Sequence, residues 1–104
     1  MYKRQLEYDP LFNSYKRVKK LIKELRLDSS KSSYCIALLN SIFNCLFSYK
    51  GDYIDICIET KKRYYINNYG MPEDLVDIII SIVSEEIDKW LDIKEREKKE
   101  KENK

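Results

Sequence analysis

The residues best suited to chemistry or binding gather in one short stretch, residues 61–69. Three cations are followed there by three tyrosines: Lys61, Lys62, Arg63, Tyr64, Tyr65 and Tyr69. Cations beside aromatic rings can hold phosphates and stack on bases, as in proteins that bind single-stranded nucleic acid. Tyrosine and arginine are also favoured anchors of protein interfaces. An ordinary turn with half-buried tyrosines is the third interpretation of this stretch.

The chain contains no histidine, which removes the most familiar catalytic sites. A Ser-His-Asp triad, a Cys-His pair and a histidine-containing zinc site are all excluded. Three dispersed cysteines are too few for an all-cysteine structural zinc site, and no glycine-rich phosphate loop is present. The nearest acids, Asp55 and Glu59, have no second carboxylate pair beside them for metal binding or acid–base work. We therefore expect a protein that is not an enzyme and that binds no cofactor or metal.

The three cysteines, Cys35, Cys45 and Cys57, are an odd number and lack CxxC spacing. If Cys35 and Cys45 share one helix, their separation along its axis is about 15 Å, which is too long for a disulfide. We expect three reduced and mostly buried thiols in a cytoplasmic protein. No apolar signal segment follows Met1, and no stretch has the length of a membrane-spanning helix, so we expect no membrane association.

Length and composition predict one small domain with a highly charged surface. The chain has 104 residues, of which 43% are hydrophobic and 37% are charged. A chain of this length can bury one modest core. We expect a single compact domain over residues 1–93. Residues 94–104 contain no apolar side chain and are expected to form a charged tail that is disordered or frays from the last helix.

The stretch around which the domain is organised is residues 33–49, which carries no charge. It predicts a core helix over about 31–49, with Gly51 ending it. Before it, Asp9-Pro10 is a typical helix start, and apolar residues spaced three and four apart predict a helix over about 10–27. After it, Met71-Pro72 and two acids begin a last helix that runs to about residue 93.

Residues 53–67 are the ambiguous segment. Isoleucines at every second position predict a strand over 53–59, and a second β-rich run covers 63–67. The expected fold is therefore α+β, in the order helix, helix, β-hairpin, helix, with the second helix buried. The alternative is a helix here, with Asp52 as its cap and three cations near its end, which makes an all-α four-helix bundle.

Charge is distributed unevenly along the chain. Residues 1–50 carry ten basic and four acidic side chains, whereas residues 51–104 carry ten and fourteen. The first helix is basic and the last helix is acidic, so both faces are candidate partner surfaces. The residues selected from these two helices are Lys16, Lys20, Lys23, Asp77, Asp88 and Asp92.

These features favour non-catalytic binding of a macromolecule through protein–protein contact. The size and the abundance of residues with AT-rich codons suggest a small inhibitor, immunity protein or anti-defence or regulatory protein of a phage or mobile element. The alternative is a small nucleic-acid-binding protein that uses the basic first helix and residues 61–69. A homodimer that forms through the hairpin edge or the charged helix faces is a further expectation.

Overall fold

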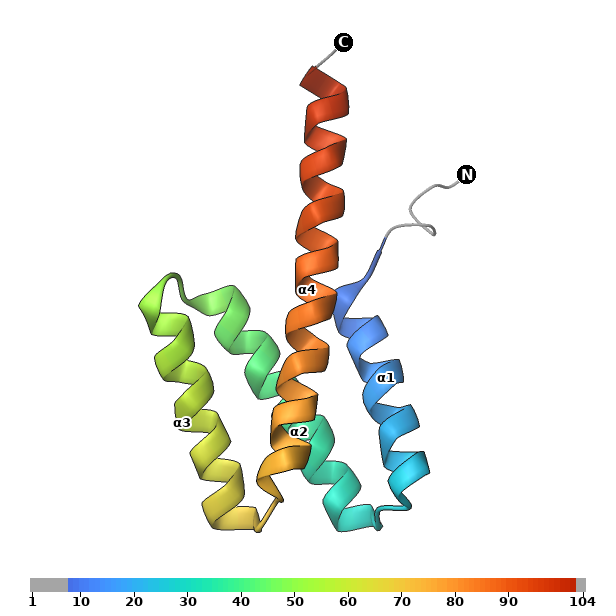
Figure 1. The fold of residues 1–104 in the computed structure, drawn as a ribbon, viewed down its shortest axis with the longest axis vertical. Helices are drawn as coiled ribbons and strands as arrows, with labels where there is room; N and C mark the ends of the chain where they lie inside the picture. The colour runs from blue at the N-terminus through green and yellow to red at the C-terminus, as the bar shows by residue number, and fades with distance from the viewer. Residues whose placement is uncertain (1–7, 103–104) are drawn as a thin grey trace.

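Four helices make up the part of the chain that the structure describes, which is residues 8–102, and no strand occurs there. In this computed structural model the elements are α1 (Pro10–Leu25), α2 (Ser29–Ser48), α3 (Asp52–Tyr69) and α4 (Glu73–Glu102). The helices form an up-and-down bundle with short connections (Figure 1).

The first two helices begin where the sequence predicts. The Asp9 side chain accepts hydrogen bonds from the backbone N–H groups of Leu11 and Phe12, and Pro10 occupies the first turn of α1. The Asp28 side chain accepts from the backbone N–H of Lys31 and caps α2 in the same way. These caps fix the helix starts because they satisfy backbone donors that have no partner within the helix.

The expected β-hairpin over residues 53–67 is wrong, because this segment is the helix α3. Ile54 and Ile58 lie one helical turn apart and are half-buried, whereas Ile56 between them is 61% exposed. The alternation that suggested a strand therefore comes from an apolar residue on the outer face of a helix. The α+β fold is replaced by the alternative, an all-α four-helix bundle, and a dimer through a hairpin edge is removed with it.

Two glycines with positive φ mark the ends of α3. Gly70 has a φ of 67° and forms the left-handed C-cap of the helix. Gly51, with a φ of 60°, lies at the N-cap of α3. The expectation that Gly51 ends the second helix is wrong, since α2 ends at Ser48 with Tyr49 as its C-cap.

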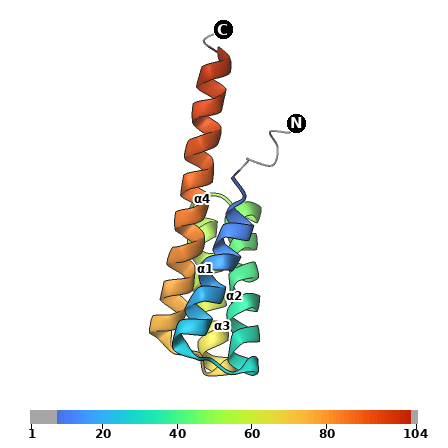
Figure 2. The same ribbon diagram turned by 90° about the vertical axis from the view of Figure 1, so that its right-hand side faces the viewer.

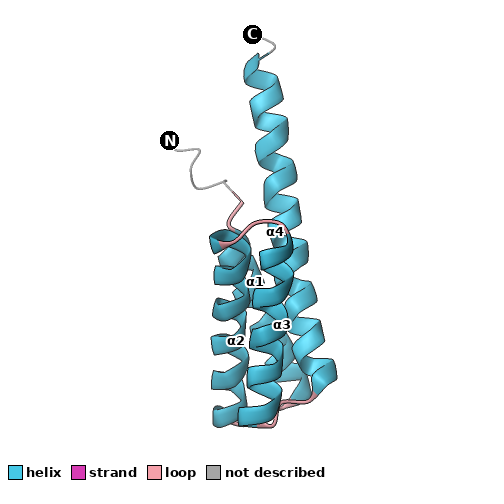
Figure 3. Ribbon diagram, turned by 90° about the vertical axis from the view of Figure 1, so that its left-hand side faces the viewer, coloured by secondary structure: helices cyan, strands magenta, loops and turns pink. Residues whose placement is uncertain are grey.

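The arrangement places α1 and α3 on opposite sides of the bundle. Both helices contact α2 and α4, and α1 and α3 share no close backbone contact in the described part of the chain. Figure 2 views the bundle from the side of α1, and Figure 3 views it from the side of α3. Each of these two helices therefore has one face toward the core and one face toward solvent.

The core lies between α2 and α4. Leu38 and Ile42 of α2, with Val76 and Ile79 of α4, are fully buried. From α1 the largest buried side chain is Val18, and from α3 only Tyr65 is buried. The prediction of a buried second helix is thus confirmed for its inner face.

The expectation of three reduced cysteines is also wrong. Cys45 and Cys57 form a disulfide between α2 and α3, with their Cα atoms 5.7 Å apart, and Cys35 is the free and buried cysteine. Because α3 is a helix antiparallel to α2 behind a short turn, Cys57 comes to lie beside Cys45. A cytoplasmic location therefore loses the support that reduced thiols would give it.

The last helix continues past the predicted end at residue 93. It spans Glu73–Glu102, which is about 45 Å of helix, whereas α1 to α3 have 16 to 20 residues. Its C-terminal part consequently projects beyond the other three helices (Figure 1). Among the described residues, no helix is both long enough and apolar enough to cross a membrane.

Candidate functional site

The outer face of α1 is basic and partly aromatic. Lys16, Lys20 and Lys23 are all exposed there, as the sequence predicts for solvent-facing positions. The Lys16 ammonium lies 5.1 Å from the centre of the Phe12 ring, which is itself 55% exposed. Lysines held against exposed rings combine positive charge with apolar contact area.

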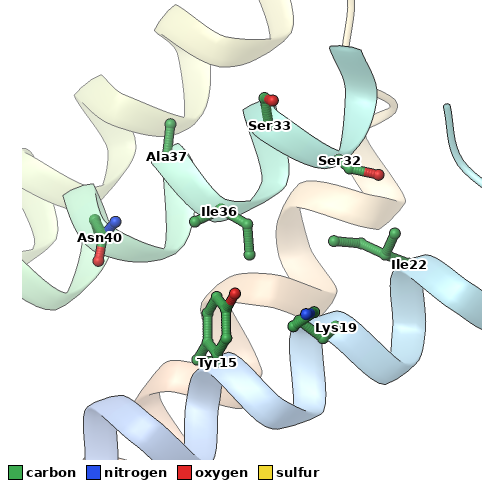
Figure 4. A pocket seen from close by; sticks show the side chains of 8 residues that line it. All are labelled: Tyr15, Lys19, Ile22, Ser32, Ser33, Ile36, Ala37 and Asn40. Carbon is green, nitrogen blue, oxygen red and sulfur yellow. The ribbon is translucent and has the colours of Figure 1, made fainter. Parts of the chain in front are cut away.

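An open groove of about 550 Å³ runs between α1 and α2. Figure 4 shows Ile22 and Ile36 pointing into this space from the two helices, with Tyr15 standing beside them. We call this space the α1–α2 groove, and its lining residues are Tyr15, Lys19, Ile22, Ser32, Ser33, Ile36, Ala37 and Asn40. The lining is mainly apolar, and Lys19 lies at its α1 edge.

The α2 wall of the groove is uncharged and includes several small residues. Ser33 and Ala37 lie one turn apart and are both exposed, and Asn40 and Asn44 continue the same exposed side. No charged residue occurs between Lys31 and Lys50, although 37% of the chain is charged. Interface cores are depleted in charge, and small side chains allow close approach of another helix. This side of the bundle therefore has the character of an interface core with a basic edge.

The three candidate tyrosines belong to one aromatic cluster between α2 and α3. Tyr69 stacks on Tyr34 of α2 with ring centres 4.4 Å apart, and Tyr64 and Tyr65 both contact the Tyr69 ring. Tyr65 is buried, and its hydroxyl lies 3.3 Å from that of Ser41. A hydrogen bond with the Tyr64 hydroxyl raises the pKa of Tyr69. Tyr65 and Tyr69 therefore join α3 to α2, whereas Tyr64 contacts these two rings of its own helix and remains 50% exposed.

The three candidate cations of α3 are separated from one another around the helix. Lys62 forms ion pairs with Glu73 at 3.2 Å and Asp77 at 3.0 Å, and the hydrogen bond with Asp77, followed by that with Glu73, raises the pKa of Lys62. Arg63 bonds to Glu59 at 3.0 Å on the outer face. Lys61 is half-buried. The structure therefore does not assemble the continuous basic patch that the sequence suggested.

The three candidate acids of the last helix have different surroundings. Asp77 is the partner of Lys62, and Asp92 pairs with Arg96 at 2.6 Å within α4. Asp88 is exposed. Two of these acids thus belong to ion pairs at the surface, which contribute little stability.

An ion pair between the buried Glu86 and the partly exposed Arg17 joins α1 to α4. The carboxylate of Glu86, only 3% exposed, accepts a hydrogen bond from Arg17 at 2.8 Å and another from the Tyr8 hydroxyl. Arg17 also reaches Glu85 at 3.0 Å. A buried carboxylate is tolerated only when it is paired. We interpret this cluster as a structural contact that stabilises the packing of α1 on α4.

Groups suited to metal binding do not converge in the described residues, where no three His, Cys, Asp or Glu side chains come together. The Cys35 thiol is fully buried, and burial raises its pKa. A thiol of that kind is a poor nucleophile, because the thiolate is the reactive form.

Sequence reasoning identified the lysines of α1 but missed the groove beside them. The available signal was the uncharged run from Ser32 to Tyr49, which includes exposed positions such as Ala37. It was interpreted as a helix buried on most sides, whereas one side of it faces solvent. The disulfide and the buried Glu86 depend on helix contacts that the pattern of single residues does not reveal.

No family model matches the chain, and the searches of curated proteins and of solved structures also find no match.

Proposed function

We propose that this chain is a non-catalytic binding protein that docks an acidic, amphipathic helical segment of another protein along the α1–α2 groove. The observation that carries the proposal is the uncharged side of α2 next to the lysines of α1. The apolar residues Ile22 and Ile36 would receive the apolar side of the segment.

Charge supports the choice of an acidic partner. Lys16, Lys19, Lys20 and Lys23 are exposed along α1, and only Glu24 opposes them on the outer side of that helix. Such an edge steers an acidic segment to the groove and rejects a basic one. The groove is open along its length, which suits a helix better than an enclosed small molecule.

Nucleic-acid binding is the alternative function. The proposed nucleic-acid surface used the first helix together with residues 61–69, whereas α1 and α3 lie on opposite sides of the bundle. Lys62 and Arg63 are also engaged by acids of the same chain. These facts weaken a surface that spans both segments, and leave the α1 lysines as the part of this alternative to test.

A pair of matched variants tests the proposal. Ala37→Glu places a carboxylate, which repels an acidic segment, at an exposed position of the groove, whereas Ser81→Glu makes a similar change at an exposed position of α4 outside the groove. Tagged wild-type protein and both variants are used to capture partners from cells that contain the chain, with nuclease present. We expect wild type and Ser81→Glu to retain the same protein, and Ala37→Glu to lose at least about tenfold of its affinity.

The opposite results are equally clear. Equal capture by Ala37→Glu would reject the groove as the binding site. Recovery of nucleic acid without nuclease, lost on raising the salt and on changing Lys16, Lys20 and Lys23 to Glu, would establish the alternative function.

Inhibitors, immunity proteins and anti-defence proteins act through contacts of this kind, and we propose that class for the chain. The origin in a phage or mobile element and the cytoplasmic location remain predictions, which the identity of the captured protein would test.

A further inference from the structure

The outer face of α3 is unusually apolar for a solvent-exposed surface. Tyr53 is 68% exposed, Ile56 is 61% exposed and Tyr64 is 50% exposed. With Thr60 they follow spacings of three, four and four residues, so they form one stripe along the helix. We call these four residues the α3 outer stripe.

Charge along α3 changes sign at the middle of this stripe. The acids Asp52, Asp55 and Glu59 all precede Thr60, and the bases Lys61, Lys62 and Arg63 all follow it. Of the bases, Lys62 points to α4, while Arg63 lies on the outer face beside Asp55, Ile56 and Glu59. The outer face therefore has an acidic first half and an arginine in its second half.

From this pattern we infer that α3 pairs with the α3 of a second copy, in antiparallel orientation about a twofold axis near Thr60. Arg63 bonds to Glu59 of its own chain at 3.0 Å, and an antiparallel copy adds its Arg63 to the same acidic group of Asp55 and Glu59, with the reverse contact following by symmetry. A parallel copy would instead place Arg63 against Arg63 and acid against acid. The charges thus favour the antiparallel pair.

The same geometry covers the apolar stripe. With the axis at Thr60, Ile56 of one chain lies level with Tyr64 of the other, because each is four residues from the axis. Two such contacts form, one on each side of the axis. Removal of Ile56 and two tyrosines from water supplies the driving force that the paired charges alone would not.

This surface is independent of the α1–α2 groove. The outer face of α3 lies on the side opposite to α1 (Figures 2 and 3), so pairing through it leaves both grooves open. A dimer would carry two grooves and could bind a repeated or dimeric partner with greater avidity. The inference does not depend on what occupies the groove.

Sedimentation equilibrium of the isolated chain gives the first test. We expect wild type to dimerise reversibly below millimolar concentration. Ile56→Asp should raise the dissociation constant of the dimer at least about tenfold, since it puts a carboxylate at the centre of an apolar contact. The matched control is Ile78→Asp, at an exposed isoleucine of α4 that is outside the proposed contact; its dimer should be as stable as wild type.

Cysteine cross-linking then tests the orientation. Thr60→Cys lies near the proposed axis, so mild oxidation should link two chains through this residue on a non-reducing gel. Tyr53→Cys lies seven residues from the axis, which separates it from its copy by about 21 Å, and it should not cross-link to itself.

Three outcomes would overturn the inference. They are a monomeric wild type at millimolar concentration, equal loss of the dimer in Ile56→Asp and Ile78→Asp, and equal cross-linking through Thr60→Cys and Tyr53→Cys. The last result would indicate a parallel pair or random collisions. Ile56→Asp leaves the groove intact, so its capture of the partner tests the proposed function independently of the dimer. A failed dimer with retained capture would overturn only this inference.

Discussion

Helices α1 and α3 occupy equivalent places in the bundle, yet they are held to it by different interactions. Each contacts α2 and α4 from one side. Helix α1 buries Pro10, Ser14 and Val18, and its Arg17 meets the buried Glu86 of α4. Helix α3 buries only Tyr65 and is joined to α2 by the Cys45–Cys57 disulfide.

The difference indicates where the chain uses its apolar residues. In α1, Val18 and Leu21 pack into the core and the lysines face solvent, as expected for an amphipathic surface helix. Phe12 and Leu25 near the ends of α1 are 55% and 50% exposed. In α3 apolar residues lie on both sides, so Ile56 and Tyr53 remain exposed. A covalent link compensates for the weaker packing of α3. The outer faces are correspondingly different: α1 presents lysines with an exposed Phe12, and α3 presents an apolar stripe beside acids and Arg63.

The largest expected effect is loss of the disulfide. Cys45 and Cys57 are twelve residues apart, and a cross-link that closes a loop of this size stabilises by about 3 kcal/mol. Reduction should lower the free energy of unfolding by about that amount and increase hydrogen exchange in α3 before α1. Chemical denaturation with and without reductant measures the change.

The control for this experiment is a chain in which Cys45 and Cys57 are both changed to Ala, whose stability should not respond to reductant. Equal loss of protection in α1 and α3 would contradict the distinction between the two helices.

A pair of truncations compares the packing of the two helices. Val18→Ala removes two methyl groups from a fully buried site in α1 and should cost about 2 kcal/mol. Ile56→Ala removes more atoms from an exposed site in α3 and should change the stability of the monomer by less than about 0.5 kcal/mol. Both values come from urea denaturation at low protein concentration. Similar costs would show that α3 is packed as firmly as α1.

The Arg17–Glu86 ion pair is expected to have a smaller effect. Arg17→Met leaves the Glu86 carboxylate buried with the Tyr8 hydroxyl and with Lys89 at 3.7 Å. The Arg17 side chain is 40% exposed, so we expect a loss of about 1–2 kcal/mol rather than the larger cost of a fully buried pair. Lys16→Met, at an exposed position of the same helix, is the control and should be nearly neutral. If Arg17→Met were as stable as wild type, this ion pair would not stabilise the packing of α1 on α4.

The projecting end of α4 should matter least for stability. A chain that ends at Ile93 keeps every core residue of the described structure, so its free energy of unfolding should stay within about 0.5 kcal/mol of the full chain. Circular dichroism should still record fewer helical residues. A large loss of stability would show that the compact domain extends beyond residue 93.

The tyrosine cluster gives a pH-dependent comparison with no counterpart on α1. The Tyr64 hydroxyl raises the pKa of Tyr69, so the folded state holds this proton more tightly than the unfolded state. The contribution of this hydrogen bond to the stability of the folded state is present below the ordinary tyrosine pKa of about 10. It is lost as the pH rises through the raised pKa of Tyr69. In NMR titrations Tyr64→Phe should lower the pKa of Tyr69, and an unchanged value would contradict the assigned contact.

The sequence was sufficient for three helices and insufficient for the fourth. Helices α1, α2 and α4 have clear starts and strong apolar patterns, and their predicted starts agree with the structure within about two residues. Helix α3 was misassigned because Ile56 imitates a strand pattern from the outer face. The expectation of three reduced cysteines failed because the distance argument concerned Cys35 and Cys45, whereas the contact between α2 and α3 brings Cys57 beside Cys45.

The candidate site was predicted in part. The exposed positions of Lys16, Lys20 and Lys23 followed from helical periodicity, but the groove depends on how α1 and α2 pack. Lys62 was selected as a binding residue, whereas contact between α3 and α4 places it beside Glu73 and Asp77. The periodicity of one helix does not show which residues of a neighbouring helix its side chains will contact.

The most direct test uses isoleucine methyl groups as reporters in NMR spectra of the chain titrated with its captured partner. Ile22 and Ile36 line the groove, Ile56 reports on the outer face of α3, and Ile78 reports on α4. We predict that the partner shifts the signals of Ile22 and Ile36 and leaves those of Ile56 and Ile78 unchanged. Shifts confined to Ile56 or Ile78, with Ile22 and Ile36 unaffected, would contradict binding in the α1–α2 groove.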